Sequence, residues 1–268
     1  MIRLQGKEVN VGHFPDGTLL LKEVIEESEK NSEIVITWNF ENNEELLAVY
    51  FLTKHIKAAG YENIVLDMPY IPNARQDRVK EAQDVFTLKY FAELINSLGF
   101  QKVRVLDAHS NVSLALLDRV ENRSPKLYIE QAIGDIKKER GREPLLFYPD
   151  EGAGKRYSGM ISAPYCLGMK VRDWSSGDIK ELTILGEKDS IPGRDILIVD
   201  DICSFGGTFL FSAEKLKEAG AENIYLYVSH CEENIGKGKL LKSGYFQRIY
   251  TTDSIFRKEY ENITVIRE

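Results

Sequence analysis

The stretch ILIVDDICSFGGTF, residues 196–209, joins an apolar run to two adjacent carboxylates and a glycine-rich turn. The apolar run predicts a buried strand of a parallel sheet, which Asp200 and Asp201 end. A helix is expected to begin after the turn, over residues 207–220. Ligands of open α/β sheets bind beyond the carboxyl ends of the strands. The stretch therefore predicts an α/β fold with a binding site at this point of the chain.

The residues of the loop indicate which kind of ligand would bind there. Gly206 and Gly207 let the backbone approach a ligand closely, and the start of the helix offers free N–H groups to an anion. A phosphate suits the loop, and the two carboxylates suit sugar hydroxyls or a magnesium ion. The alternative is a solvated acidic turn before a glycine-assisted helix start. The loop by itself therefore favours a phosphosugar site and nothing more specific.

Strands alternate with helices along the rest of the chain, which predicts parallel sheets covered by helices. The sequence A-G-x-E-N-I occurs at 59–64 and again at 219–224, each time between a helix and a strand. This repetition indicates two similar α/β halves, which we place at residues 1–128 and 129–268. The expected strands are 33–38, 63–70, 102–109, 144–152, 163–173, 195–202 and 223–230, and the expected helices are 41–60, 84–99 and 207–220.

Composition narrows the class of protein. The chain has 268 residues and a formal net charge of -7, which disfavours nucleic acid and anionic membranes as partners. The three cysteines (Cys166, Cys203 and Cys231) are too few and too widely spaced for a disulfide framework or a zinc site. No apolar stretch is long enough to span a membrane. We expect a soluble, cytoplasmic protein with reduced cysteines.

Six segments resemble, in the same order, motifs of the ribose-phosphate pyrophosphokinases, the synthetases of phosphoribosyl diphosphate (PRPP). The glycine-rich loop alone also resembles that of ordinary phosphoribosyltransferases, but these enzymes lack a counterpart of PYIPNARQDR. The resemblance implies two tandem phosphoribosyltransferase-like (Rossmann-like) halves with mainly parallel sheets, and assembly into homodimers or homohexamers. The segments are GHFPDGT (12–18), PYIPNARQDR (69–78), VLDAHS (105–110), YPDEGAGKR (148–156), KVR (170–172) and the loop that ends at Thr208.

The resemblance also implies an activity and a set of site residues. Enzymes of this family transfer the β,γ-diphosphate of ATP to the 1-hydroxyl of ribose 5-phosphate, with Mg²⁺ bound. By residue-for-residue matching, His109 and Asp150 would hold the metal, while Lys170 and Arg172 would be catalytic. The matched ATP-binding residues are Phe14, Asp16, Arg75, Gln76, Asp77 and Arg78, and the matched ribose-phosphate-binding residues are Asp200, Asp201, Ser204, Phe205, Gly206, Gly207 and Thr208.

The loop departs from the family pattern Asp-Thr-Gly-Gly-Thr at two positions. Ser204 removes a negative charge beside the sugar, and Phe205 removes a hydroxyl donor and adds a ring. The segment GHFPDGT resembles the adenine-binding loop of the family, and Thr18 replaces a carboxylate that often follows its glycine. These changes leave three hypotheses open: an enzyme acting on ribose 5-phosphate, the same chemistry on a larger acceptor such as ADP-ribose, or a catalytically silent regulatory partner.

Overall fold

The computed structural model describes residues 1–23, 31–172 and 179–267, and for residues 170–172 and 179–181 it describes the backbone alone. The chain divides into two compact units, Met1–Ser124 and Pro125–Glu268. The boundary that we predicted, after residue 128, lies inside helix α4 (Lys126–Arg140). Pro125 occupies the N-cap position of this helix, so the junction carries a short Ser-Pro turn signal and no longer linker.

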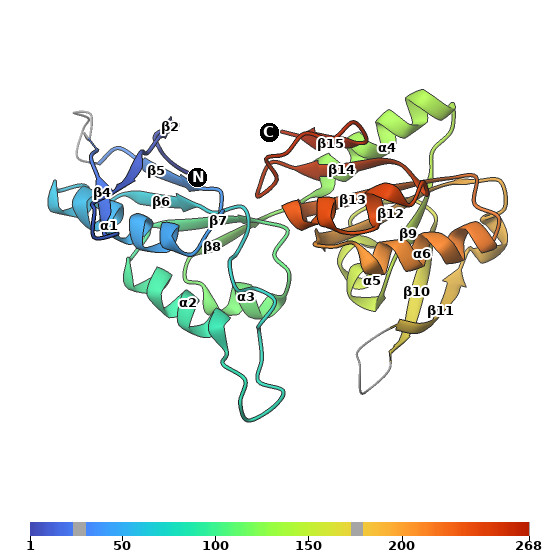
Figure 1. Ribbon diagram of the computed structural model, residues 1–268, viewed down its shortest axis with the longest axis horizontal. Helices are drawn as coiled ribbons and strands as arrows, with labels where there is room; N and C mark the ends of the chain where they lie inside the picture. The colour runs from blue at the N-terminus through green and yellow to red at the C-terminus, as the bar shows by residue number, and fades with distance from the viewer. Residues whose placement is uncertain (24–30, 173–178, 268) are drawn as a thin grey trace. The chain divides into compact units, whose positions relative to one another are not determined.

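The first unit contains a six-stranded sheet in the order β2-β1-β5-β6-β7-β8 (Figure 1). Strands β5 to β8 run parallel, while β1 pairs antiparallel with β5. A separate hairpin is formed by β3 (Val11–His13) and β4 (Leu19–Leu21). The strands of the sheet are β1 (Ile2–Leu4), β2 (Lys7–Glu8), β5 (Ile34–Trp38), β6 (Ile64–Asp67), β7 (Lys102–Leu106) and β8 (Val120–Arg123), and the helices are α1 (Glu44–Ala58), α2 (Thr87–Ser97) and α3 (Asn111–Leu116).

Alternation along β5 explains how the helices pack on this sheet. Ile34, Ile36 and Trp38 are buried, whereas the residues between them are partly exposed. The buried set joins one core with the apolar faces of α1 and α2. This is the period-two pattern of a strand that buries one face.

Two strands of the first unit end earlier than we predicted. The strand predicted over 102–109 stops at Leu106, because Asp107 adopts a left-handed backbone conformation with φ of 45°. The strand predicted over 63–70 stops at Asp67, and the N–H of Met68 donates instead to the carbonyl of Arg104. Both strands therefore open into loops at their carboxyl ends, where the ARQDR and VLDAHS segments lie.

The second unit contains a seven-stranded sheet in the order β11-β10-β9-β12-β13-β14-β15. All neighbouring strands run parallel except β10 and β11, which form an antiparallel pair. The strands are β9 (Leu145–Tyr148), β10 (Tyr165–Arg172), β11 (Ile179–Gly186), β12 (Asp195–Cys203), β13 (Asn223–Cys231), β14 (Phe246–Thr252) and β15 (Ile263–Ile266). The helices besides α4 are α5 (Glu151–Tyr157), α6 (Gly207–Glu218) and the short η1 (Lys188–Ser190), η2 (Glu233–Lys237) and η3 (Leu240–Lys242).

Helices cover both faces of the second sheet. Ile196 and Ile198 of β12 join the core beneath α6, whereas Leu197 and Val199 join the core beneath α4 and α5. A strand buried on both faces reads as a continuous apolar run, as residues 196–199 do. The structure thus confirms the predicted α/β class with mainly parallel sheets.

Three further findings bear on the expectations from composition. All three cysteines are buried free thiols. In the part of the chain that the structure describes, no helix is long and apolar enough to cross a membrane. The helix predicted over 207–220 is observed as α6, and α4 and α5 are additional helices that the sequence reading did not include.

Candidate active site

The two adjacent carboxylates lie at the carboxyl end of β12, in the middle of the second sheet. Asp201 is only 4% exposed, and its Oδ2 lies 2.8 Å from Nη1 of Arg156. Arg156 comes from α5, which follows the neighbouring strand β9. The guanidinium therefore compensates one of the two negative charges at this point of the sheet.

Asp200 lies in a more strongly negative environment than Asp201. Burial of its carboxyl, followed by the charges of Asp201 and Asp150, raises the pKa of Asp200 well above its usual range. Asp150 caps α5, and its Oδ1 accepts a hydrogen bond from the N–H of Ala153 at 3.0 Å. Three carboxylates from two adjacent strands thus gather where a sugar or a cation could bind.

The loop after β12 leads directly into α6. Gly206 has φ of 80°, a conformation that side chains with a Cβ rarely adopt, and α6 begins at Gly207. The ring of Phe205 is 56% exposed. The loop therefore presents backbone, the start of a helix and one exposed ring, the arrangement that anions use at helix N-termini.

In the first unit, the structure brings together the ARQDR and VLDAHS segments. Asp77 is 7% exposed, and its carboxylate accepts hydrogen bonds from Nε of Arg78, at 2.9 Å, and from Ser110. Burial would raise the pKa of Asp77, but these hydrogen bonds and the charges of Arg78 and His109 outweigh burial and lower it. Gln76 accepts a hydrogen bond from Thr87 at 2.8 Å, and the side chain of Arg75 is exposed.

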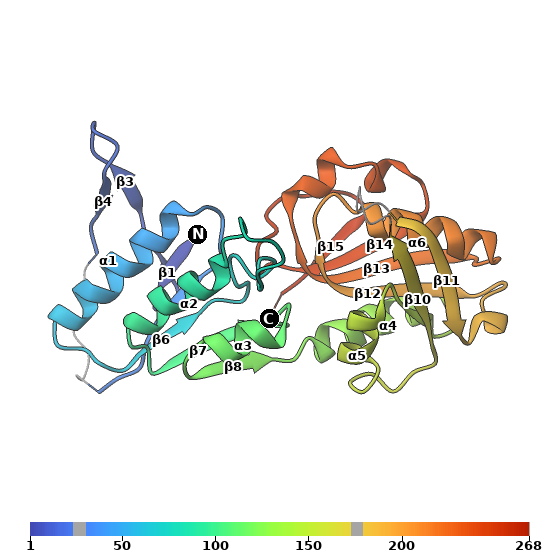
Figure 2. The same cartoon turned by 90° about the horizontal axis from the view of Figure 1, so that it is seen from below.

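Phe14 and Asp16 lie at the turn of the β3–β4 hairpin, which projects from its unit in Figure 2. Phe14 is 49% exposed, so it is not a core residue. Asp16 accepts hydrogen bonds from the N–H and the hydroxyl of Thr18, which lower its pKa. Thr18, the residue that departs from the family pattern, thus fixes the carboxylate of Asp16 within the turn.

The two residues predicted to be catalytic occupy the end of β10. The backbone of Lys170 pairs with Leu182 of β11, and that of Arg172 pairs with Ile179. The side chains of both residues lie outside the described part of the chain, as do residues 173–178 entirely. The roles of Lys170 and Arg172 therefore stay predictions.

The two predicted metal ligands belong to different units: His109 follows β7 and Asp150 follows β9. Within the described ranges, no group of three or more His, Cys, Asp or Glu side chains is arranged to hold a metal ion. Asp150 and the Asp200–Asp201 pair nevertheless suit Mg²⁺, which takes one or two carboxylates and completes its shell with water and phosphate oxygens. The carboxylates of Asp201 and Asp150, which contribute to the raised pKa of Asp200 after desolvation, are charges that a divalent cation would offset.

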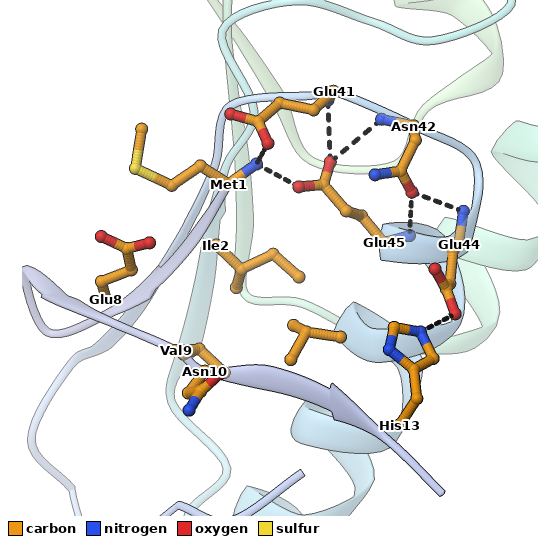
Figure 3. A pocket seen from close by; sticks show the side chains of 11 residues that line it. Met1, Ile2, Glu8, Val9, Asn10, His13, Glu41, Asn42, Glu44 and Glu45 are labelled. Carbon is orange, nitrogen blue, oxygen red and sulfur yellow. Dashed lines mark hydrogen bonds and ion pairs between the residues drawn. The ribbon is translucent and has the colours of Figure 1, made fainter. Parts of the chain in front are cut away.

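A cavity of about 670 Å³ in the first unit contains none of the predicted site residues (Figure 3). Its lining includes Glu8, Glu41, Glu44 and Glu45. His13 pairs with Glu44 at 2.6 Å, and the amino group of Met1 pairs with Glu41 and Glu45. This concentration of carboxylates disfavours the phosphates of a nucleotide, so the cavity does not compete with the predicted site.

The structure places two residues at the site, Arg156 and Glu232, to which the sequence motifs gave no role. Arg156 lies within the quoted segment YPDEGAGKR, so its position could have been inferred from the motif. Glu232 contacts Ser204, but it lies 28 residues further along the chain and belongs to none of the six segments. Only the pairing of β12 with β13 brings it to the loop.

The two units, each with a mainly parallel sheet and functional segments at the carboxyl ends of its strands, define a tandem α/β protein of the phosphoribosyltransferase-like class. The PRPP synthetase of Mycobacterium smegmatis has the same fold, with a TM-score of 0.77 at 17% identity over 97% of this chain and 86% of that one.

Sequence comparisons show which known proteins the chain resembles. Residues 2–99 match the model for the N-terminal domain of ribose phosphate pyrophosphokinase. The ribose-phosphate pyrophosphokinase of Vibrio cholerae is 26% identical over 254 residues, which cover 92% of this chain and 79% of that protein. The enzyme of the same name from Pyrococcus abyssi is 26% identical over 224 residues, which cover 83% and 75%. The first part of the chain thus matches the N-terminal domain of these enzymes, and most of its length is similar to whole ribose-phosphate pyrophosphokinases.

Proposed function

We propose that this protein is a Mg²⁺-dependent diphosphokinase that converts ATP and ribose 5-phosphate into PRPP and AMP. The observation that carries the proposal is the Asp200–Asp201 pair at the end of β12, followed directly by the glycine-rich loop and the start of α6. The similarity to ribose-phosphate pyrophosphokinases indicates which reaction such a phosphosugar site would serve. The same similarity supports homodimers or homohexamers, and the two substrates suit a cytoplasmic enzyme.

In the proposed reaction, the 1-hydroxyl oxygen of the sugar attacks the β-phosphorus of ATP. The bond from that phosphorus to the bridging α,β-oxygen breaks, AMP leaves with the oxygen, and the hydroxyl proton is lost to solvent. The β,γ-diphosphate is then attached to carbon 1 of the sugar. Such transfers depend on positioning and charge neutralisation more than on covalent chemistry by the protein.

The second unit would hold the acceptor. Asp200 and Asp201 would accept hydrogen bonds from the 2- and 3-hydroxyls of the ribose, and Arg156 orients the second of these carboxylates. The backbone of residues 204–208 would bind the 5-phosphate. Asp150 would contribute to the Mg²⁺ site, and the ion would neutralise the phosphate oxygens of ATP.

The first unit would hold the nucleotide. Arg75 would contact the ATP phosphates, and Asp77 keeps Arg78 in place through their hydrogen bond. Phe14 would stack near the adenine, which its exposure permits. Lys170 and Arg172 would stabilise the charge that develops on the transferred group, where Arg suits a planar multi-donor contact and Lys a mobile point charge.

The exposed ring of Phe205 favours a second candidate acceptor. A ring beside the 5-phosphate loop offers a stacking surface to an acceptor with an aromatic group beyond that phosphate, such as ADP-ribose. A silent regulatory partner is disfavoured, because the matched catalytic, metal and sugar-binding residues occur together: Lys170, Arg172, His109, Asp150, Asp200 and Asp201.

Parallel assays of AMP release with ribose 5-phosphate and with ADP-ribose test the proposal. The Ser204→Asp/Phe205→Thr variant then tests selection between them. If the loop suits a bulky acceptor, the variant turns over ribose 5-phosphate faster and ADP-ribose more slowly. An unchanged ratio would show that these positions do not select the acceptor. No AMP release with either sugar, in the presence of Mg²⁺, would contradict the proposed activity.

A further inference from the structure

The acceptor loop is contacted by the segment that follows β13. The hydroxyl of Ser204 donates a hydrogen bond to Oε2 of Glu232 over 2.6 Å. The N–H of Glu232 in turn donates to the carbonyl of Cys203 over 2.7 Å. Glu232 is thus joined both to the last residue of β12 and to the first residue of the loop.

The next two residues of the loop, Phe205 and Gly206, lie with their backbones against the segment after β13. A Cβ at Gly238 would lie 2.2 Å from the carbonyl oxygen of Phe205, so only glycine allows this approach. A Cβ at Gly206 would lie 2.3 Å from Cδ1 of Leu240. Three successive loop residues, 204 to 206, are therefore each held by residues between 232 and 240.

The contact with Glu232 changes the charge of the loop. The family pattern has a carboxylate at the position of Ser204, so the sequence predicted a loss of negative charge there. The structure shows that Glu232 brings a carboxylate to the same residue from the neighbouring strand. Ser204 itself carries no charge, as the sequence predicted, but a carboxylate from outside the loop lies against it.

We propose that Glu232 is a positioning residue of the acceptor site, which acts through Ser204 and supplies the carboxylate missing from the loop. The inference rests on the proposed function of that loop. A short hydrogen bond to a carboxylate is among the stronger ones in proteins. It holds the start of the loop in one conformation before the acceptor arrives, which lowers the ordering cost of binding.

Steady-state kinetics of the Ser204→Ala and Glu232→Ala variants test this inference. Each substitution should raise KM for ribose 5-phosphate about tenfold, as expected when one hydrogen bond to a charged group is lost. Neither kcat nor KM for ATP should change appreciably. The double variant should be no worse than either single one, because both remove the same interaction.

A relocated carboxylate distinguishes positioning from simple packing. Ser204→Asp combined with Glu232→Ala should return KM for ribose 5-phosphate to within about twofold of the original, because the charge is restored from within the loop. The matched control is Glu233→Ala, since Glu233 pairs with Lys258 at 3.0 Å. Where Glu232→Ala lowers the folded fraction, Glu232→Gln is measured instead, and a severalfold rise in the same KM is expected.

The outcomes separate this inference from the proposed function. An unmodified protein that turns over ribose 5-phosphate while its Glu232 variants keep the same KM would overturn the role of Glu232 alone. Equal rises in KM for both substrates, additive effects of the two substitutions, or no rescue by the Ser204→Asp substitution would also overturn it. An unmodified protein that neither binds nor converts ribose 5-phosphate would overturn both proposals.

Discussion

Asp200 and Asp201 are neighbours with opposite electrostatic surroundings. Asp201 is paired with Arg156, whereas Asp200 has an elevated pKa because its carboxyl is desolvated and feels the charges of two other carboxylates. In the protein without ligands, this arrangement costs folding free energy at neutral pH. Sites that bind cations or polar ligands commonly carry such a cost, because the ligand relieves it.

Asp200→Asn should increase the free energy of unfolding at neutral pH while it reduces activity. The substitution removes the desolvated charge, and an Asn Oδ1 is able to keep the hydrogen bond that Asp200 accepts from the N–H of Asp201. Each unit by which the folded pKa exceeds the unfolded one is worth roughly 1.4 kcal/mol. Urea unfolding in chelator at pH 7.5 gives this difference.

The stability gained by Asp200→Asn should depend on pH in a way that follows from the raised pKa of Asp200. Because the folded pKa of Asp200 is raised, the destabilisation is complete above the folded pKa. It declines as the pH falls through that value and is absent below the ordinary pKa of about 4. A gain of equal size at pH 7.5 and at pH 4 would therefore contradict the electrostatic explanation.

Asp201→Asn should weaken the acceptor selectively. A charged hydrogen bond to a sugar hydroxyl contributes roughly 1.5–3 kcal/mol, so KM for ribose 5-phosphate should rise about 10- to 100-fold. KM for ATP should stay nearly constant. Asp189→Asn, an exposed carboxylate of the same unit in η1, is the control. A parallel rise in both KM values would show that Asp201 does not act on the acceptor alone.

At the scale of elements, the β10–β11 hairpin carries the residues that we assign to catalysis. Lys170→Ala and Arg172→Ala should each lower kcat by about 10²–10³ with a smaller effect on KM for ATP, because their charges act on the transition state. Single-turnover kinetics with saturating ATP isolates this effect. If the variants have raised KM values and an unchanged kcat, Lys170 and Arg172 only bind substrate and do not stabilise the transition state.

Strand β10 packs closely against its neighbours at Gly168, where there is no room for a side chain. A Cβ there would lie 2.8 Å from the carbonyl oxygen of Pro149 and 2.9 Å from Cδ1 of Leu182. Gly168→Ala should therefore destabilise the protein by about 1–3 kcal/mol, the usual cost of overpacking.

Gly134→Ala is the matched control for that substitution. Gly134 lies on the exposed side of α4 with no atom within 4 Å of an added Cβ, so alanine should stabilise the helix by about 0.5–1 kcal/mol. Thermal unfolding of both variants compares the two glycines. A stable Gly168→Ala variant would show that β10 adjusts to the added methyl group.

The elements that the sequence predicted are those with strong local signals. The apolar runs of β9, β12 and β13 are buried, and β5 alternates as a strand with one buried face does, so the types of these elements were clear. Helix α4 was missed because only Ile129, Ala132 and Ile136 of its residues are buried and most of the others are polar. The ends of β6 and β7 depend on loop conformations, such as the left-handed Asp107, that no local pattern indicates.

In the whole molecule, six short segments were enough to predict the fold and to suggest the chemistry. Each of them lies near the carboxyl end of a strand or in a turn, where ligands of α/β sheets bind. The Ser204–Glu232 contact could not be predicted in this way, since it depends on which strands are neighbours. The segments assigned to the nucleotide and to the acceptor belong to different units. We therefore expect one chain to combine both segments in a single diphosphate transfer.

The most direct test of that claim is product analysis by chromatography and ³¹P NMR. Purified protein is incubated with ATP, ribose 5-phosphate and Mg²⁺, with an EDTA-treated sample in parallel. We expect equal amounts of AMP and PRPP, with the diphosphate attached to carbon 1, and no product in excess EDTA. Release of ADP, formation of AMP without PRPP, or full activity in EDTA would contradict it.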